Sequence, residues 1–126
     1  MSAFVLDAGA LIAVDRGDRD VVADLSRARL RGIGFRTTGI VVAQAWRSGG
    51  RQAELARLLA SADVQPVDQA MGRAAGALLG RARLQDAIDA TVVLVAQDGD
   101  TIVTSDVEDI DHLATHLGRR VSVMRC

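Results

Sequence analysis

Aspartates mark three points of the sequence at which a predicted buried element ends or begins. Asp7 directly follows the apolar run AFVL, Asp106 follows TIVTS, and Asp86 opens the stretch DAIDATVVLVAQ. A carboxylate at the end of a buried strand costs several kcal/mol unless something compensates its charge, and a bound cation would do so. Carboxylates that converge on one point bind hard divalent ions through oxygen. The sequence therefore predicts that Asp7, Asp86 and Asp106 are metal ligands.

The chemistry that fits such a site is metal-assisted hydrolysis of a phosphodiester. Magnesium keeps several of its waters and takes only one or two carboxylates directly, which leaves room for a phosphate oxygen and an attacking water. No covalent nucleophile is required. Asp7, Asp86 and Asp106 are accordingly the predicted catalytic residues as well.

Further polar residues lie beside these three. Asp89 follows Asp86 by one helical turn, in a stretch that is otherwise almost entirely apolar, so its charge reaches either the helix rim or the site. Asp109 follows Asp106 at the same spacing, and Ser105 directly precedes Asp106. An alternative interpretation of Asp86 and Asp106 is that they cap helices, because a carboxylate is stabilised by the free N–H groups of a first turn.

The elements that must position these residues alternate along the chain. Strands are predicted at 3–6, 33–38, 63–67, 101–105 and 120–125, and helices at 18–31, 40–47, 52–62, 68–83, 86–97 and 107–117. Strands that alternate with helices at this spacing form an open parallel sheet with helices on both faces, because parallel neighbours require crossovers. The predicted fold is a three-layer α/β domain with five parallel strands. Pro66 places the third strand at an edge.

Composition limits the class of protein. The chain of 126 residues fits one domain, and its aromatic content of 2% means that Ala, Val, Leu and Ile form the core. The single cysteine, Cys126, leaves no internal disulfide and no thiolate cluster for zinc. No signal peptide or apolar run of membrane-spanning length is evident, so we expect a cytoplasmic protein without a membrane partner.

Four segments together resemble the PIN-domain ribonucleases, specifically the VapC-type toxins of bacterial type II toxin–antitoxin systems. They are VLDAGALIA, TTGIVVAQAWR, LQDAIDATVVLVA and TIVTSDVEDI, in this order along the chain. The resemblance implies a single three-layer α/β/α PIN domain over residues 1–126 and a magnesium-dependent endoribonuclease, with Mn²⁺ as a substitute ion.

The resemblance also assigns residues. Its metal-binding aspartates fall on Asp7, Asp86 and Asp106, and Asp109 occupies the position of a further acid. Many relatives carry an apolar or small residue where this chain has Asp89, which makes Asp89 an additional candidate. The family usually has a glutamate where this chain has Gln44, whose amide carries no charge and cannot act as a base.

Partners implied by the resemblance are a VapB-type antitoxin that blocks the site, a second copy forming a homodimer, and a transfer or ribosomal RNA substrate. Trp46 is a candidate contact for the antitoxin and equally a candidate core residue. The candidates for holding RNA are four arginines in or near predicted loops: Arg16, Arg19, Arg47 and Arg51.

Two alternatives compete with the nuclease. A PIN-like module with weakened catalysis that mainly binds its antitoxin fits the neutral Gln44. Phosphatase and receiver-type domains also place an aspartate after the first strand, but they need a second acid nearby, and Asp7 is followed by Ala8 and Gly9 in a chain without lysine. Separately, His112 and His116 are four residues apart in a predicted helix, a spacing that can place both on one metal ion. The alternative interpretation is that both histidines lie on a solvated face of the helix.

Overall fold

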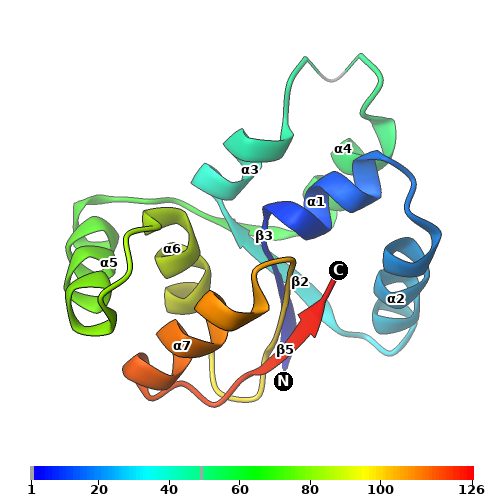
Figure 1. The fold of residues 1–126 in the computed structure, drawn as a ribbon. Helices are drawn as coiled ribbons and strands as arrows, with labels where there is room; N and C mark the ends of the chain where they lie inside the picture. The colour runs from blue at the N-terminus through cyan, green and yellow to red at the C-terminus, as the bar shows by residue number, and fades with distance from the viewer. Residues whose placement is uncertain (1, 49) are drawn as a thin grey trace.

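A five-stranded sheet, parallel throughout, forms the centre of the molecule (Figure 1). The computed structural model describes residues 2–48 and 50–126. The strands are β1 (Ala3–Leu6), β2 (Gly34–Thr38), β3 (Asp63–Gln65), β4 (Thr101–Thr104) and β5 (Ser122–Arg125), arranged in the order β3-β2-β1-β4-β5. The predicted α/β fold with five parallel strands is confirmed, and β3 lies at the edge where Pro66 places it.

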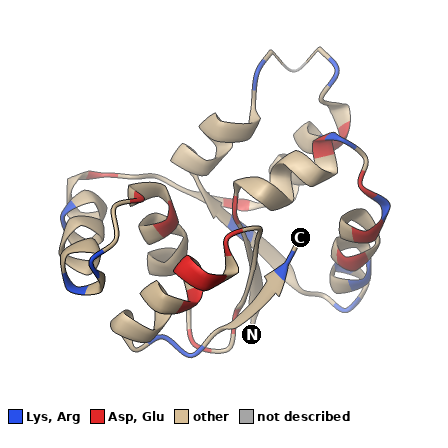
Figure 2. Ribbon diagram, viewed as in Figure 1, with Lys and Arg blue, Asp and Glu red and all other residues tan. Residues whose placement is uncertain are grey.

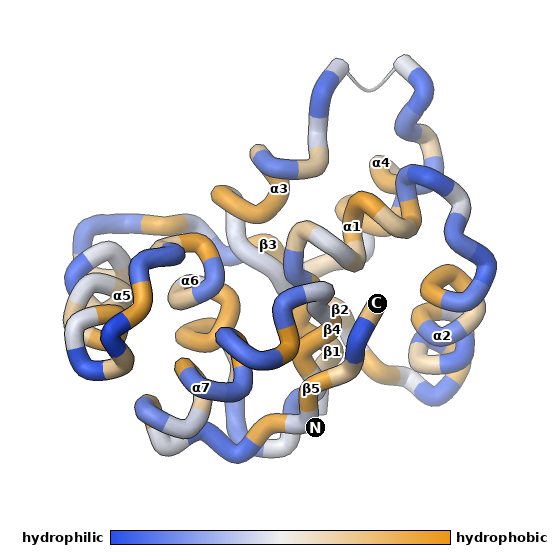
Figure 3. Tube along the Cα trace, in the orientation of Figure 1, coloured by the Kyte–Doolittle hydropathy of each residue, from blue (hydrophilic) through white to orange (hydrophobic). Residues whose placement is uncertain are grey.

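Seven helices in the described residues cover the two faces of the sheet. They are α1 (Ala8–Asp15), α2 (Arg19–Leu30), α3 (Gly39–Ala45), α4 (Ala53–Ser61), α5 (Gln69–Ala82), α6 (Ala87–Val95) and α7 (Val107–Leu117). One layer contains α5, α6 and α7, which pack on one another, while α1 packs on β4 and gathers α2, α3 and α4 around it. Apolar segments concentrate along the central strands and α6 (Figure 3). No helix among the described residues has the length and apolar character needed to cross a membrane.

Helix α1 is absent from the predicted set of helices, and its sequence explains why. The segment AGALIAVD is apolar on nearly every side: Ala10, Leu11 and Val14 are buried, and Ile12 is half-buried against the same core. A helix buried all round has no polar stripe at a period of 3.6 residues, which is the pattern that reveals most helices in a sequence. Asp7 therefore ends β1 and caps the helix that follows directly.

Gly9 lies where α1 passes close to Ser105, the residue that follows β4. A Cβ atom at Gly9 would lie 2.7 Å from Ser105 Oγ, 3.1 Å from Ser105 Cβ and 3.2 Å from Cys126 Sγ. On α5, by contrast, a Cβ at Gly76 would meet no described atom within 4 Å. Both glycines therefore have a helical backbone, but only Gly76 has free space for a methyl group.

Alanine substitution should move stability in opposite directions at these two glycines. Gly76→Ala is expected to stabilise the protein by about 0.5–1 kcal/mol, because alanine favours the helix. Gly9→Ala is expected to destabilise it by about 1–3 kcal/mol through overpacking. Urea unfolding of both variants measures the difference. Equal stabilisation by the two substitutions would contradict the close packing of α1 on Ser105.

Candidate metal centre

Acidic residues gather where β1 and β4 end (Figure 2). These strands are neighbours, with Leu6 paired to Val103, and the Asp7 N–H continues the ladder by donating to the Val103 carbonyl at 3.0 Å. The chain leaves β1 for β2 on one side, and β4 lies on the other. Such a change of direction is the point at which open parallel sheets bind ligands. The first turns of α1, α6 and α7 all start near this end of the sheet.

Asp7 is held rigidly at this end of the sheet. It is 5% exposed, and its Oδ1 accepts from the Ala8 N–H at 2.7 Å, which caps α1. Its Oδ2 accepts from the Thr104 hydroxyl at 2.7 Å. Burial raises the pKa of Asp7, and the charges of Asp86 and Asp106 add to this rise, while the two hydrogen bonds oppose it. The structure therefore brings Asp7 into the field of two other predicted site residues.

Three carboxylates come together beside Asp7. One oxygen from each of Asp89, Asp106 and Asp109 lies within 4.8 Å of the others. Asp89 is 5% exposed, and its Oδ2 is buried without a hydrogen-bond partner in the described chain. Asp106 stands at the N-cap position of α7, yet its side chain makes no capping hydrogen bond to a described residue. The capping interpretation of Asp106 thus does not account for the direction of its carboxylate.

Asp86 differs from the other acids because it does cap a helix. Its Oδ1 accepts from the N–H groups of Ile88 and Asp89 at 2.9 and 3.0 Å, and the residue is exposed. Its charge nevertheless contributes to the raised pKa of both Asp7 and Asp89. The helix-capping interpretation of Asp86 therefore describes the geometry of this residue. The role of Asp86 as a metal ligand stays a prediction. The close group of three carboxylates contains Asp89, which is buried, with Asp106 and Asp109, which are half-buried.

Two auxiliary candidates, Gln44 and Ser105, are exposed. Gln44 is exposed on α3, which packs against α1 and α6. Ser105 is exposed between β4 and α7, next to Gly9. Thr104 links two acids, because its Oγ1 donates to Asp7 and accepts from the backbone N–H of Asp106 at 3.0 Å.

The histidines, the tryptophan and the arginines have other surroundings. His112 Nε2 donates to the Ala82 carbonyl and His116 Nδ1 to the His112 carbonyl, at 2.9 and 3.0 Å, and neither joins the acidic group among the described residues. Trp46 is half-buried against the core. The four arginine candidates are all exposed: Arg16, Arg19, Arg47 and Arg51. Arg47 and Arg51 line a polar pocket of about 500 Å³.

The metal-free protein is expected to lose stability as the pH rises from about 5 to about 8. Burial raises the pKa of Asp89 most, followed by a hydrogen bond with the Asp106 side chain and by the negative charges of the neighbouring aspartates. Together they raise this pKa from 3.8 to about 8. Between these two values the folded protein binds a proton that the unfolded chain releases. The resulting stabilisation is fully present below the unfolded pKa and is lost as the pH rises through the folded pKa.

Urea unfolding in EDTA across this pH range measures the effect, and Asp89→Asn should flatten it, because an amide does not titrate. A pH dependence that is identical in the parent and in Asp89→Asn would show that Asp89 does not carry the extra proton.

The architecture is that of a three-layer α/β/α domain with a central parallel five-stranded sheet, as predicted. The chain is similar to a chain in the crystal structure of VapBC2 from Rickettsia felis bound to a DNA fragment from their promoter. The likeness covers 98% of this chain and 98% of that chain, with a TM-score of 0.66 and 12% sequence identity. No family model matches the chain, and no curated protein matches its sequence. At this identity the similarity establishes the fold.

Proposed function

We propose that the protein is the toxin of a toxin–antitoxin pair and acts as a magnesium-dependent endoribonuclease. The observation that carries this proposal is the buried Oδ2 of Asp89, which has no hydrogen-bond partner among the described residues and lies next to Asp106 and Asp109. The likeness to a chain of VapBC2 supports the toxin assignment through the fold. Asp89, Asp106 and Asp109 would hold the ion, with Asp7 beside them.

The residues present fit a hard divalent ion. The donors are carboxylate oxygens, which Mg²⁺ and Mn²⁺ prefer over nitrogen or sulfur ligands. Burial and mutual repulsion raise the pKa values of Asp7 and Asp89. A cation at this point would remove the repulsion and give Asp89 Oδ2 a partner, so ion binding would offset the cost of burying these acids.

A bound magnesium ion would polarise the scissile phosphate and make water a better nucleophile at neutral pH. The protein's own residues have simpler tasks. Thr104 and the Ala8 N–H fix the Asp7 carboxylate, so that it can accept a hydrogen bond from the attacking water. Hydrolysis adds water across the phosphodiester: the new P–O bond forms as the old one breaks, and the leaving oxygen takes a proton. Gln44 cannot act as a base, but its amide can donate to a phosphate oxygen.

RNA would approach through exposed arginines rather than through aromatic stacking. Arg47 and Arg51 line one polar pocket with Asp15 and Gln52, close to the end of α1 that lies away from Asp7. Guanidinium groups match phosphate geometry. We propose a transfer or ribosomal RNA as substrate, an antitoxin that covers the acidic group, and a homodimer of toxin copies.

The test of the proposal is RNA cleavage by the purified protein with Mg²⁺ or Mn²⁺ and with EDTA, together with calorimetric titration of Mn²⁺. Metal binding and cleavage that EDTA abolishes would support the nuclease. Absence of both would favour a second function, a module that mainly binds its antitoxin, for which the neutral Gln44 is the specific observation. If the protein cleaves RNA, sequencing of the RNA ends that it produces would identify the substrate.

A further inference from the structure

The peptide group that joins Ile88 to Asp89 is held by side chains on both of its polar atoms. The Ile88 carbonyl accepts from the Thr91 hydroxyl at 2.7 Å, and the Asp89 N–H donates to Asp86 Oδ1 at 3.0 Å. The first N–H groups of a helix have no intrahelical acceptor, so the Asp86 contact supplies one that would otherwise be missing. Two neighbours in α6 therefore set the direction of the backbone that carries Asp89.

Thr38, at the carboxyl end of β2, connects this peptide group to the sheet. Its Oγ1 lies 3.2 Å from Thr91 Oγ1, and the two residues are 0% and 3% exposed. Because the single hydroxyl proton of Thr91 goes to Ile88, Thr38 is the donor of this bond. The hydrogen bonds thus run from Thr38 through Thr91 to the peptide group of Asp89.

Thr38 makes this connection in place of a local one. It stands at the N-cap position of α3, where threonine is a favoured residue, but its side chain makes no capping hydrogen bond to a described residue. The hydroxyl instead reaches α6, which is 53 residues away in the sequence. A buried hydroxyl that gives up the local bond for a distant one fixes the relative position of two elements.

The acids around Asp89 explain why its backbone needs to be held. Asp7, Asp86 and Asp106 all repel a negative charge on Asp89. Without a restraint, an ionised Asp89 would move away from Asp106, and the first turn of α6 would follow it. The connection from Thr38 acts on the peptide group next to Asp89, where it opposes this movement most directly.

We propose that Thr38 and Thr91 are positioning residues that hold Asp89 beside Asp106 and Asp109 in the geometry that binds a divalent ion. They act through Asp89 and touch neither the ion nor the substrate. The inference rests on the proposed metal centre, because it concerns the affinity of that centre.

The test is Mn²⁺ affinity, measured by electron paramagnetic resonance on Thr38→Val, Thr91→Val and the double variant. Valine keeps the shape of threonine and removes the hydroxyl. Each variant is expected to bind Mn²⁺ about tenfold more weakly, the lower end of the effect seen when a group that orients a ligand is lost. Thr38→Ser keeps the donor and is expected to retain the parental affinity. The double variant leaves neither hydroxyl unpaired, so it should fold at least as well as the single ones.

Thr115→Val is the matched control. Thr115 also donates to a carbonyl of its own helix, that of Asp111 at 2.9 Å, but it is exposed in the second half of α7. Its loss should leave the Mn²⁺ affinity unchanged.

The outcomes separate the two proposals. Parental affinity in the double valine variant would overturn the positioning role, whatever happened to the melting temperature. Equal weakening in Thr38→Ser and Thr38→Val would overturn it too, since the hydroxyl would then not be the cause. Failure of the unsubstituted protein to bind Mn²⁺ would overturn the metal centre itself, and the positioning role with it.

Discussion

Asp89→Asn is expected to weaken Mn²⁺ binding by more than about 100-fold, beyond the 10- to 100-fold typical of losing a residue that only orients a ligand. The reason is that Asp89 contributes the buried oxygen that has no partner within the described chain. An asparagine keeps the volume of the side chain but supplies no negative charge to the ion. RNA cleavage should fall below detection with the same change.

The metal-free Asp89→Asn protein should remain folded and become more stable than the parent at about pH 8. Removing the charge removes repulsion from Asp7, Asp86 and Asp106, which disfavour ionised Asp89. Loss of function together with a gain in stability is characteristic of a residue kept for its chemistry and separates Asp89 from an ordinary core position. Calorimetric titration and thermal unfolding on the same preparation measure both effects.

Asp86→Asn is the matched control for this substitution. Asparagine caps helices as well as aspartate does, so the amide oxygen of the substituted side chain can still accept from the N–H groups of Ile88 and Asp89. Only a charge at an exposed position is lost, and we expect the Mn²⁺ affinity to fall by less than about tenfold. The opposite result, with Asp86→Asn inactive and Asp89→Asn unaffected, would support Asp86 as a metal ligand, as predicted from the sequence, and would contradict the assignment to Asp89.

The sequence alone does not separate Asp86 from Asp89, because residues three apart share a helix face. The distinction arises from the start of α6. Asp86 has extended backbone angles, φ −78° and ψ 100°, and turns its carboxylate back onto the first N–H groups. Asp89 lies inside the helix and is buried toward Asp106. The signal for Asp89 was its charge within an apolar helix, and a helix boundary known to one residue decides how that signal is interpreted.

The parallel sheet could be predicted because short strand-like runs alternate with helices, and parallel neighbours require such crossovers. The runs AFVL of β1 and TIVT of β4 are the clearest of these strands. The hydrogen-bond partners of the buried threonines could not be predicted. Thr37 donates to the Leu6 carbonyl, Thr38 to Thr91 and Thr104 to Asp7, across 31, 53 and 97 residues. A hydroxyl in a sequence does not indicate a partner that far away, since only the folded sheet brings the two together.

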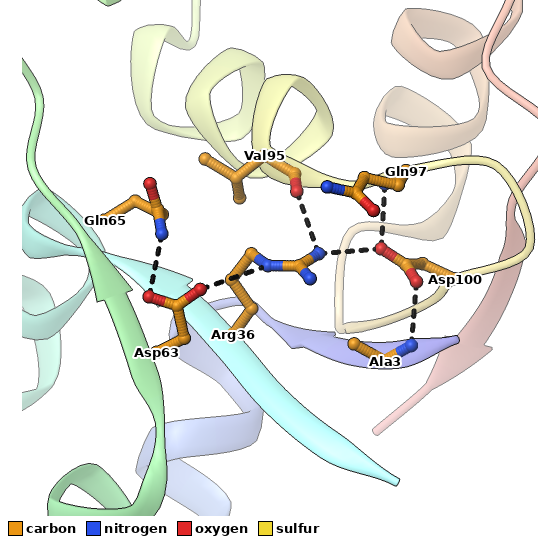
Figure 4. Close-up of polar contacts among 7 residues, drawn as sticks. All are labelled: Ala3, Arg36, Asp63, Gln65, Val95, Gln97 and Asp100. Carbon is orange, nitrogen blue, oxygen red and sulfur yellow. Dashed lines mark hydrogen bonds and ion pairs between the residues drawn. The ribbon is translucent and has the colours of Figure 1, made fainter. Parts of the chain in front are cut away.

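Asp100 is a further buried acid, and it lies beside Ala3 at the amino ends of β1 and β4 (Figure 4). It is 1% exposed. Its Oδ1 accepts from the Ala3 N–H at 2.7 Å, and its Oδ2 accepts from the Gln97 N–H and from Arg36 Nη1, both at 2.8 Å. Arg36 Nη1 also donates to the Val95 carbonyl at 3.0 Å. One carboxylate therefore joins the starts of β1 and β4 to β2 and the end of α6.

Asp100→Ala is expected to destabilise the protein by about 3–5 kcal/mol, the usual effect of removing one partner from a buried ion pair. The substitution leaves two backbone N–H groups without their acceptor. Arg36, whose side chain is 17% exposed, keeps its hydrogen bond to the Val95 carbonyl, and its nearest acid among the described residues is then Asp63 at 3.5 Å. Asp24→Ala is the control, because Asp24 pairs with Arg27 on the surface of α2 and should contribute less than about 1 kcal/mol. Urea unfolding measures the two losses.

Mn²⁺ affinity distinguishes the two ends of the sheet. Folded Asp100→Ala should bind the ion as the parent does, since Asp100 and the acidic group lie at opposite ends of β4. A loss of stability without a loss of affinity would show that Asp100 stabilises the fold and takes no part in ion binding, which divides the roles of the two ends of the sheet. Equal stability of Asp100→Ala and Asp24→Ala would contradict this division, because Asp100 would then contribute no more than a surface pair.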